Sequence, residues 1–141
     1  MRIVGLLVAT GLGLVLIMSV AISSATAQGG LSRFQGAWLS GSADCADVYS
    51  STGRRTSFKK SVDIFAPAFI VAGNQLRTPQ ATCRIRSTRP TGDRQVLVLG
   101  CTNAVAGNEV RLLMASQADG SLRRYFNERD TTGTEYKRCS P

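Results

Sequence analysis

Apolar and polar positions alternate along most of the chain beyond residue 30, which is the pattern of half-buried β-strands. These runs are rich in β-branched and aromatic residues and recur about every 8 to 12 residues, separated by turn residues. Asp119-Gly120 is a strong hairpin signal. The pattern predicts an all-β fold, a single antiparallel meander of about eight strands that closes into a small barrel. The expected strands lie at 33–41, 61–66, 69–78, 82–88, 95–102, 109–116, 121–127 and 134–139, and the longest irregular segment lies at 40–56.

Two cysteines stand at equal distances on either side of Gly92 in the segment TCRIRSTRPTGDRQVLVLGCT (82–102). If a hairpin turns at Gly92, Cys83 and Cys101 become directly opposed cross-strand partners. Opposed positions have Cβ atoms ~4.5–5.5 Å apart, close to the ~3.5–4.5 Å that a disulfide needs. The symmetry therefore predicts a Cys83–Cys101 disulfide.

The same register assigns residues to the two faces of the sheet. It places Ser87 opposite Leu97, and a second hairpin over 103–108 places Cys101 opposite Val110. A one-residue slip would invert every side chain, so a buried face specifies the register strongly. The strand at 121–127 leaves two alternatives, with either Tyr125 or the Leu122/Phe126 pair pointing inward. The expected inner face contains Cys83, Ile85, Ser87, Leu97, Leu99, Cys101, Val110, Leu112 and Met114.

The first 27 residues have the layout of a secretory signal peptide. One cation, Arg2, precedes an apolar run, and Ala25-Thr26-Ala27 forms an A-x-A cleavage site. We expect residues 1–27 to be a cleaved signal helix and residues 28–141 to be one disulfide-tied barrel domain, without a stable membrane span after cleavage. The alternative is an uncleaved membrane anchor, because the apolar run approaches the roughly 18 to 20 residues that a spanning helix needs.

All four cysteines follow this segment, and an even number of cysteines behind an export signal predicts two disulfides in an oxidising compartment. With Cys83 and Cys101 paired, Cys45 is left to pair with Cys139, and this bridge ties the 40–56 segment to the last strand. We therefore expect a periplasmic or secreted protein.

Positive charge dominates the expected mature chain, which holds 16 Lys and Arg against nine Asp and Glu, a net charge of +7. In the registers above Arg84 and Arg111 both stand opposite Gly100, and Arg86 shares their outer face. Such a cluster is a candidate anion-binding face, because guanidinium groups hold phosphate or carboxylate bidentately. The alternative is a solvated outer face whose charge only keeps the protein in solution.

The stretch FQGAWLSG (34–41) puts Gly36 and Trp38 on the first expected strand, and YKRC (136–139) puts Arg138 on the last. This arrangement resembles the lipocalin-type (calycin) barrels, in which a first-strand G-x-W tryptophan packs at the closed end under a late arginine. It is also similar to small exported bacterial proteins that share a G-x-W start, internal cysteines and a terminal Y-x-R-C. The resemblance implies that Gly36, Trp38 and Arg138 close the barrel. The chain is shorter than a typical lipocalin and lacks the other lipocalin motifs.

The composition removes several kinds of chemistry. Without histidine there is no Ser/His/Asp or Cys/His pair to activate a nucleophile and no imidazole for a zinc site, and no C-x-x-C occurs. Close carboxylate pairs occur only in turn-like polar segments, where solvated acids are usual. Few aromatic residues are present to stack nucleic-acid bases. We therefore expect no catalytic residues, metal, cofactor or nucleic-acid partner.

These observations favour a small, non-enzymatic envelope protein, and an inhibitor-like module is its sharpest form. Its expected partner is an anionic envelope polymer, another anionic macromolecule or an envelope protein, and we expect the protein to be a monomer. The alternative is a calycin-like carrier that holds a small apolar ligand inside the barrel, between Trp38, Ile85, Leu99, Leu112 and their neighbours. For Trp38 taken alone, we favour an ordinary core anchor over a ligand contact.

Overall fold

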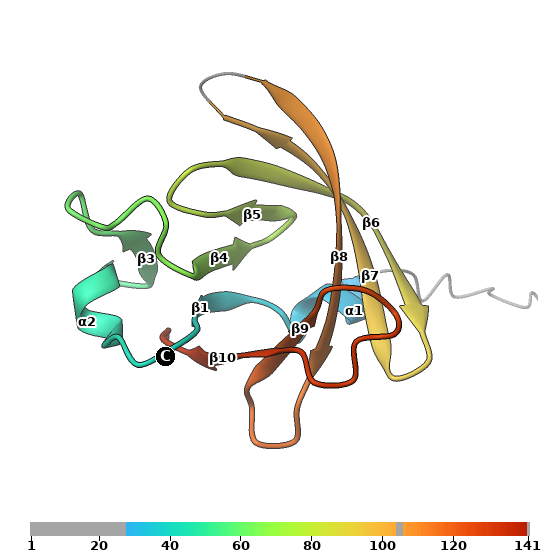
Figure 1. Ribbon diagram of the computed structural model, residues 1–141. Helices are drawn as coiled ribbons and strands as arrows, with labels where there is room; N and C mark the ends of the chain where they lie inside the picture. Colours follow the sequence, from blue (N-terminus) through green and yellow to red (C-terminus); the bar gives the residue numbers. More distant parts are fainter. Residues whose placement is uncertain (1–27, 104–105, 141) are drawn as a thin grey trace, which may run out of the picture.

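The computed structural model describes residues 28–103 and 106–140. Eight strands form a closed antiparallel barrel in the order β1-β10-β9-β8-β7-β6-β5-β4, which confirms the expected all-β barrel (Figure 1). Its strands are β1 (Gly36–Leu39), β4 (Ala68–Ala72), β5 (Gln75–Arg77), β6 (Thr82–Thr91), β7 (Arg94–Thr102), β8 (Gly107–Ser116), β9 (Leu122–Tyr125) and β10 (Thr134–Arg138).

Four short elements lie outside the barrel wall: α1 (Gln28–Ser32), α2 (Cys45–Val48) and the hairpin of β2 (Tyr49–Thr52) with β3 (Arg55–Phe58). In Figure 1, α2 and the hairpin stand together on one side of the barrel. The expected signal helix at 1–27 lies outside the described residues. Within the described ranges, no helix has the length and apolar character to span a membrane.

The 40–66 region differs from the sequence-based expectation. The segment 61–66 is not a strand, because Asp63 Oδ1 accepts a hydrogen bond from Phe65 N (2.9 Å) and Asp63 O accepts one from Ala66 N (3.0 Å), which bends the chain into a turn. The segment expected to be irregular instead contains α2 and β2. The sequence of β2, YSST, is as polar as a typical loop. This polarity suits a strand outside the barrel, where three of its four residues are exposed.

The barrel interior is filled around Trp38, whose side chain is fully buried. Its indole Nε1 donates a hydrogen bond to Phe34 O (2.8 Å), and its ring stacks on Phe69 at a centroid distance of 6.5 Å. Buried polar groups keep a hydrogen-bond partner, so this bond sets the tryptophan's orientation. The inner cluster comprises Phe34, Trp38, Phe69, Val71, Leu76, Cys83, Ile85, Leu97, Leu99, Met114, Leu122 and Tyr136.

At one end of the interior, Arg138 covers Trp38. Its guanidinium carbon lies 4.3 Å from the centroid of the indole ring, and Nη1 donates to Gln35 O (2.7 Å). This is the arrangement that the lipocalin resemblance implies. Gly36 makes room for it: its φ is +121°, and a Cβ atom there would lie 2.5 Å from Ser140 Oγ and 2.8 Å from Arg138 Nη1.

A second apolar cluster lies outside the barrel, where α2 and the β2–β3 hairpin cover β1 and β4. Tyr49 is its polar link to the barrel, since its hydroxyl lies 2.6 Å from Trp38 O and 3.2 Å from Phe69 O and donates to these carbonyls. The Cys45–Cys139 disulfide fastens α2 to the residue after β10, with a Cα–Cα distance of 5.4 Å. The hairpin and α2 therefore hold β1 against the barrel from outside.

The β6–β7 hairpin follows the expected register at one end only. Cys83 pairs with Cys101 and forms the second disulfide, the pairing expected from the sequence, with a Cα–Cα distance of 3.9 Å. Ser87, however, pairs with Val98 and not with Leu97, because the register shifts between Ile85 and Ser87. The extra residue at this β-bulge is Arg86, and the shift moves Ser87 to an exposed position.

The expected register between β7 and β8 is wrong by two residues. Cys101 pairs with Asn108 instead of Val110, and the turn is closed by Asn103, whose N donates to Ala106 O (3.1 Å) and whose Oδ1 accepts from Ala106 N (2.9 Å). A shift of two residues keeps every side chain on its face. The apolar inner face is therefore as expected, whereas the neighbours of the charged outer residues change.

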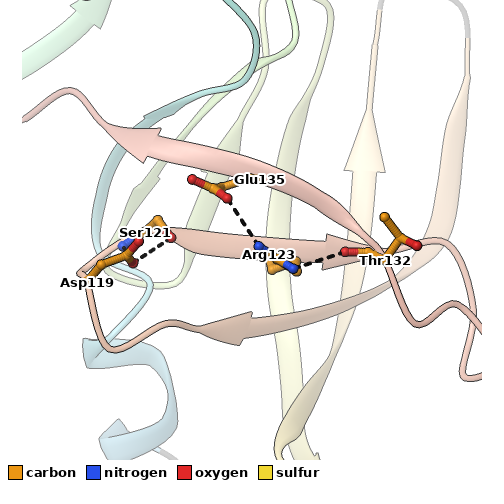
Figure 2. A network of polar contacts seen from close by, with 5 residues as sticks. All are labelled: Asp119, Ser121, Arg123, Thr132 and Glu135. Carbon is orange, nitrogen blue, oxygen red and sulfur yellow. Dashed lines mark hydrogen bonds and ion pairs between the residues drawn. The ribbon is translucent and has the colours of Figure 1, made fainter.

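The burial of the β9 side chains shows which of the two expected orientations this strand adopts. Leu122 joins the inner cluster, Tyr125 packs outside the wall in a small cluster with Leu113, and Phe126 is 91% exposed. The guanidinium carbon of Arg94 lies 3.5 Å from the centroid of the Tyr125 ring. Figure 2 shows how Arg123 ties β9 to β10 and to the loop before β10, since it donates to Glu135 Oε2 (3.1 Å) and Thr132 O (3.3 Å). The same figure shows Ser121 donating to Asp119 within the turn between β8 and β9.

Replacing Gly36 by Ala tests the closed end of the barrel. The new Cβ would displace Ser140, whose hydroxyl accepts from Ala37 N (3.0 Å), and Arg138 from the indole ring. We expect Gly36→Ala to lower the free energy of unfolding by about 3 kcal/mol or more, from backbone strain and overpacking together. The matched control is Gly120→Ala, which also has a positive φ (+85°) but open space around its Cβ. It should cost only about 1–2 kcal/mol in urea unfolding, and equal costs for the two variants would contradict this account of the closed end.

Because the hydroxyl of Tyr49 is buried, we expect the free energy of unfolding to fall at alkaline pH. Burial raises the pKa of Tyr49 far above its usual value. The unfolded chain therefore ionises at lower pH than the folded one, so the contribution of Tyr49 is complete below about pH 10 and declines above it, by up to about 1.4 kcal/mol per pH unit. Tyr49→Phe should flatten this decline while costing about 1 kcal/mol at pH 7. Urea unfolding between about pH 8 and about pH 11 measures both, and an unchanged slope in the variant would refute the assignment.

Candidate functional site

The barrel has an open end opposite the part of the interior that Arg138 covers, and a cavity of about 440 Å³ lies there. Three connections form its rim: residues 64–67 before β4, 78–81 between β5 and β6, and the turn residues Asn103 and Ala106 between β7 and β8. The deeper residues of the lining are apolar or sulfur-containing, namely Phe69, Leu76, Cys83, Leu99, Cys101, Val110, Leu112 and Tyr136. The cavity is therefore a small cup with an apolar interior and a rim of mixed apolar and polar residues.

Aromatic contacts at the floor of the cup link the cup to Trp38. Phe69 contacts Tyr136 at a ring-centroid distance of 5.1 Å and stacks on Trp38 from the other direction. The Cys83–Cys101 disulfide forms part of the wall, where it joins β6 and β7 near the rim. Aromatic packing and a covalent cross-link on the wall make this end of the barrel a largely preformed site.

Two large apolar side chains stand exposed at the rim. Ile64 is 55% exposed and Phe65 is 76% exposed. Gln80 holds their segment in place, because its Nε2 donates to Ile64 O (2.8 Å) across the opening, and Thr78 Oγ1 in turn accepts from Ala81 N (3.0 Å). An apolar ligand entering the cup would pass these two side chains and bury part of their surface.

One cation reaches the cup from β9. Arg124 pairs with Met114, which is fully buried inside the barrel, so Arg124 lies on the inner face of the wall, where it remains exposed at the opening. Within residues 28–103 and 106–140, no Asp or Glu lines the cup and Arg124 takes part in no ion pair. A guanidinium group beside an apolar lining can bind a carboxylate or phosphate head group bidentately.

The outer face that the sequence predicted as an anion-binding site contains different neighbours from those expected. Arg84 does pair with Gly100, but Glu109 takes the expected place of Arg111 on the other side of this glycine, and Arg111 pairs with Val98. Arg86, the bulge residue, lies across the bare backbone, with Nε 2.6 Å from the position that a Cβ of Gly100 would occupy. Arg86 Nη1 also lies 4.0 Å from Glu109 Oε2. A carboxylate therefore stands within the expected basic cluster.

Sequence reasoning did not single out Arg124. The strand at 121–127 was open to two registers, and an arginine on a strand usually faces water. The alternation of Leu122, Arg124 and Phe126 with the buried Tyr125 could have identified Arg124 as facing inward, once the length of the loop before this strand is known. In the part of the chain that the structure describes, no three His, Cys, Asp or Glu side chains gather as metal ligands do.

Comparison with known proteins adds no assignment, because no protein family, curated protein or solved structure matches this chain.

Proposed function

We propose that this protein is a non-enzymatic binding protein that carries a small amphipathic anion, with the apolar body of the ligand in the barrel cup and its carboxylate at Arg124. The single observation that carries this proposal is the position of Arg124, a cation at the mouth of a partly preformed cup whose deeper lining is apolar. A volume of about 440 Å³ lies at the low end of the roughly 300–1,000 Å³ that ligand pockets span, which suits one compact molecule.

The resemblance to calycins supports the same use of the fold, since the eight-stranded closed barrel is consistent with a small calycin-like carrier. The outer face of Arg84, Arg86 and Arg111 gives weaker support to an anion site, because Glu109 competes for its cations. The two disulfides favour an oxidising compartment. We therefore place the proposed carrier in the periplasm or outside the cell.

Decanoate and 1-decanol form a matched pair of probes for this function, because they share an apolar chain and differ in the charge of the head group. We expect the wild-type protein to bind decanoate about tenfold more tightly than 1-decanol, as a charge-assisted hydrogen bond contributes roughly 1.5 kcal/mol or more. Arg124→Gln should remove this preference and leave the affinity for 1-decanol nearly unchanged. Binding is measured by the fluorescence emission of Trp38, the single tryptophan of the chain, whose ring stacks on Phe69 in the lining of the cup.

Arg129→Gln is the control for net charge, because Arg129 is exposed and does not line the cup. It should bind both probes as the wild type does. A variant with a filled cup, Leu112→Trp, should lose both probes, with binding then followed by calorimetry. Equal affinity of the wild type for the two probes would overturn the role of Arg124, and binding of neither would overturn the carrier function.

A further inference from the structure

A second concave surface lies on the outside of the barrel, between the β2–β3 hairpin and the strands β1, β4 and β5. It is an open groove of about 860 Å³, lined on one side by residues 53–57 and on the other by residues 70–73 with Gln75 and Arg77. Figure 1 shows the hairpin standing next to β4 on this side of the molecule. This groove is separate from the cup, because none of the residues that the structure describes lines both of them.

Four arginines line the groove: Arg54, Arg55, Arg77 and Arg138. Two of them are tethered, since Arg77 Nη2 lies 3.5 Å from Thr56 O across the groove and Arg138 donates to Gln35 O (2.7 Å). Arg54 is exposed at the tip of the hairpin, and Arg55 is exposed at the start of β3. Over the described ranges, no acidic residue lines the groove and none of these four arginines forms an ion pair.

The positive charge continues beyond the edge of the groove. Gln75, which lines the groove, pairs with Arg84 on the next strand, so that the outward-facing Arg84 lies beside its rim. Unlike the outer face around Gly100, the groove has no carboxylate among its described lining residues to balance its guanidinium groups. Cations of one sign along a concave surface concentrate the electrostatic field and attract an anionic partner.

The shape and chemistry of the groove favour one class of anion. The four arginines are spread along the groove from the hairpin tip to the end of β10 instead of converging on one point, which fits a partner with several spaced charges. No aromatic side chain lines the described groove, so it offers no surface on which sugar rings or bases would stack. Among the described strands, β3 pairs only with β2, and its other edge has backbone groups for an extended chain.

We propose that this groove docks an acidic, extended polypeptide segment of a partner protein, whose Asp and Glu carboxylates pair with Arg54, Arg55, Arg77 and Arg138. Bidentate guanidinium–carboxylate pairs set the position of the segment, and exposed cations accelerate its association. This interaction is independent of the ligand in the cup, so each of the two can fail without the other.

The experiment uses a fluorescein-labelled peptide of alternating Glu and Thr, with a matched peptide in which Gln replaces Glu. Fluorescence anisotropy should show binding of the acidic peptide only, and this binding should weaken steeply with salt. The groove variant Arg54→Glu/Arg55→Glu should weaken it by about tenfold or more. The matched control is Arg89→Glu/Arg129→Glu, which changes net charge equally at exposed positions outside the groove and should weaken binding by less than about threefold.

The remaining outcomes decide between alternatives. Equal weakening by the groove and control variants would show that net charge alone attracts the peptide and would overturn the groove site. Binding of heparin or of phosphatidylglycerol vesicles without binding of the acidic peptide would overturn the class of partner. Should the groove variant unfold, Arg54→Gln/Arg55→Gln serves in its place, and unimpaired peptide binding by that variant would also overturn the proposal. Decanoate binding by the groove variant should equal that of the wild type, which separates this site from the cup.

Discussion

The whole barrel depends on β1, a strand of four residues that pairs with β10 on one side and with β4 on the other. Without this strand, β10 and β4 would become open sheet edges with unpaired backbone groups, and the interior would open to water. So short a strand contributes few ladder hydrogen bonds. Its position is set by side chains on both of its faces, with Trp38 anchored inside and Ala37 and Leu39 covered outside.

The covalent cross-links reinforce this closure at two levels. The Cys45–Cys139 bridge joins residues 94 apart in sequence and fastens the outer cover of β1 to the end of β10, whereas Cys83–Cys101 spans 18 residues within one hairpin. In the chain-entropy model the longer bridge stabilises the fold by about 4–5 kcal/mol and the shorter one by about 3 kcal/mol. The longer bridge secures the closed ring of strands, and the shorter one stiffens the wall of the cup.

The sequence was most informative where burial restricts the choice. The Cys83–Cys101 disulfide and the apolar inner positions of β6 to β8 followed from alternation and symmetry, because a buried face permits only one parity, and the Cys45–Cys139 disulfide followed by elimination. It was least informative where a single residue changes the outcome. The pairing at the two ends of the β6–β7 hairpin is centred on different positions, and the bulge at Arg86 accommodates the one extra residue. The hydrogen bonds between Asn103 and Ala106 set a turn that moves β8 by two positions. Neither feature changes the hydrophobic pattern, and the placement of Arg111, Glu109 and Arg124 depends on such details.

The pairing of β7 with β8 has a consequence for how this protein can change during evolution. Lengthening or shortening the Asn103–Ala106 turn so that β8 slides by two residues keeps every side chain on its face, whereas a slide by one residue would turn the core outward. Two-residue slides therefore exchange the charged neighbours on the outer surface, such as Glu109 and Arg111 beside Gly100, at little cost to the fold. A change in the length of this turn would thus alter the outer charge pattern together with the rim of the cup, to which Asn103 and Ala106 belong.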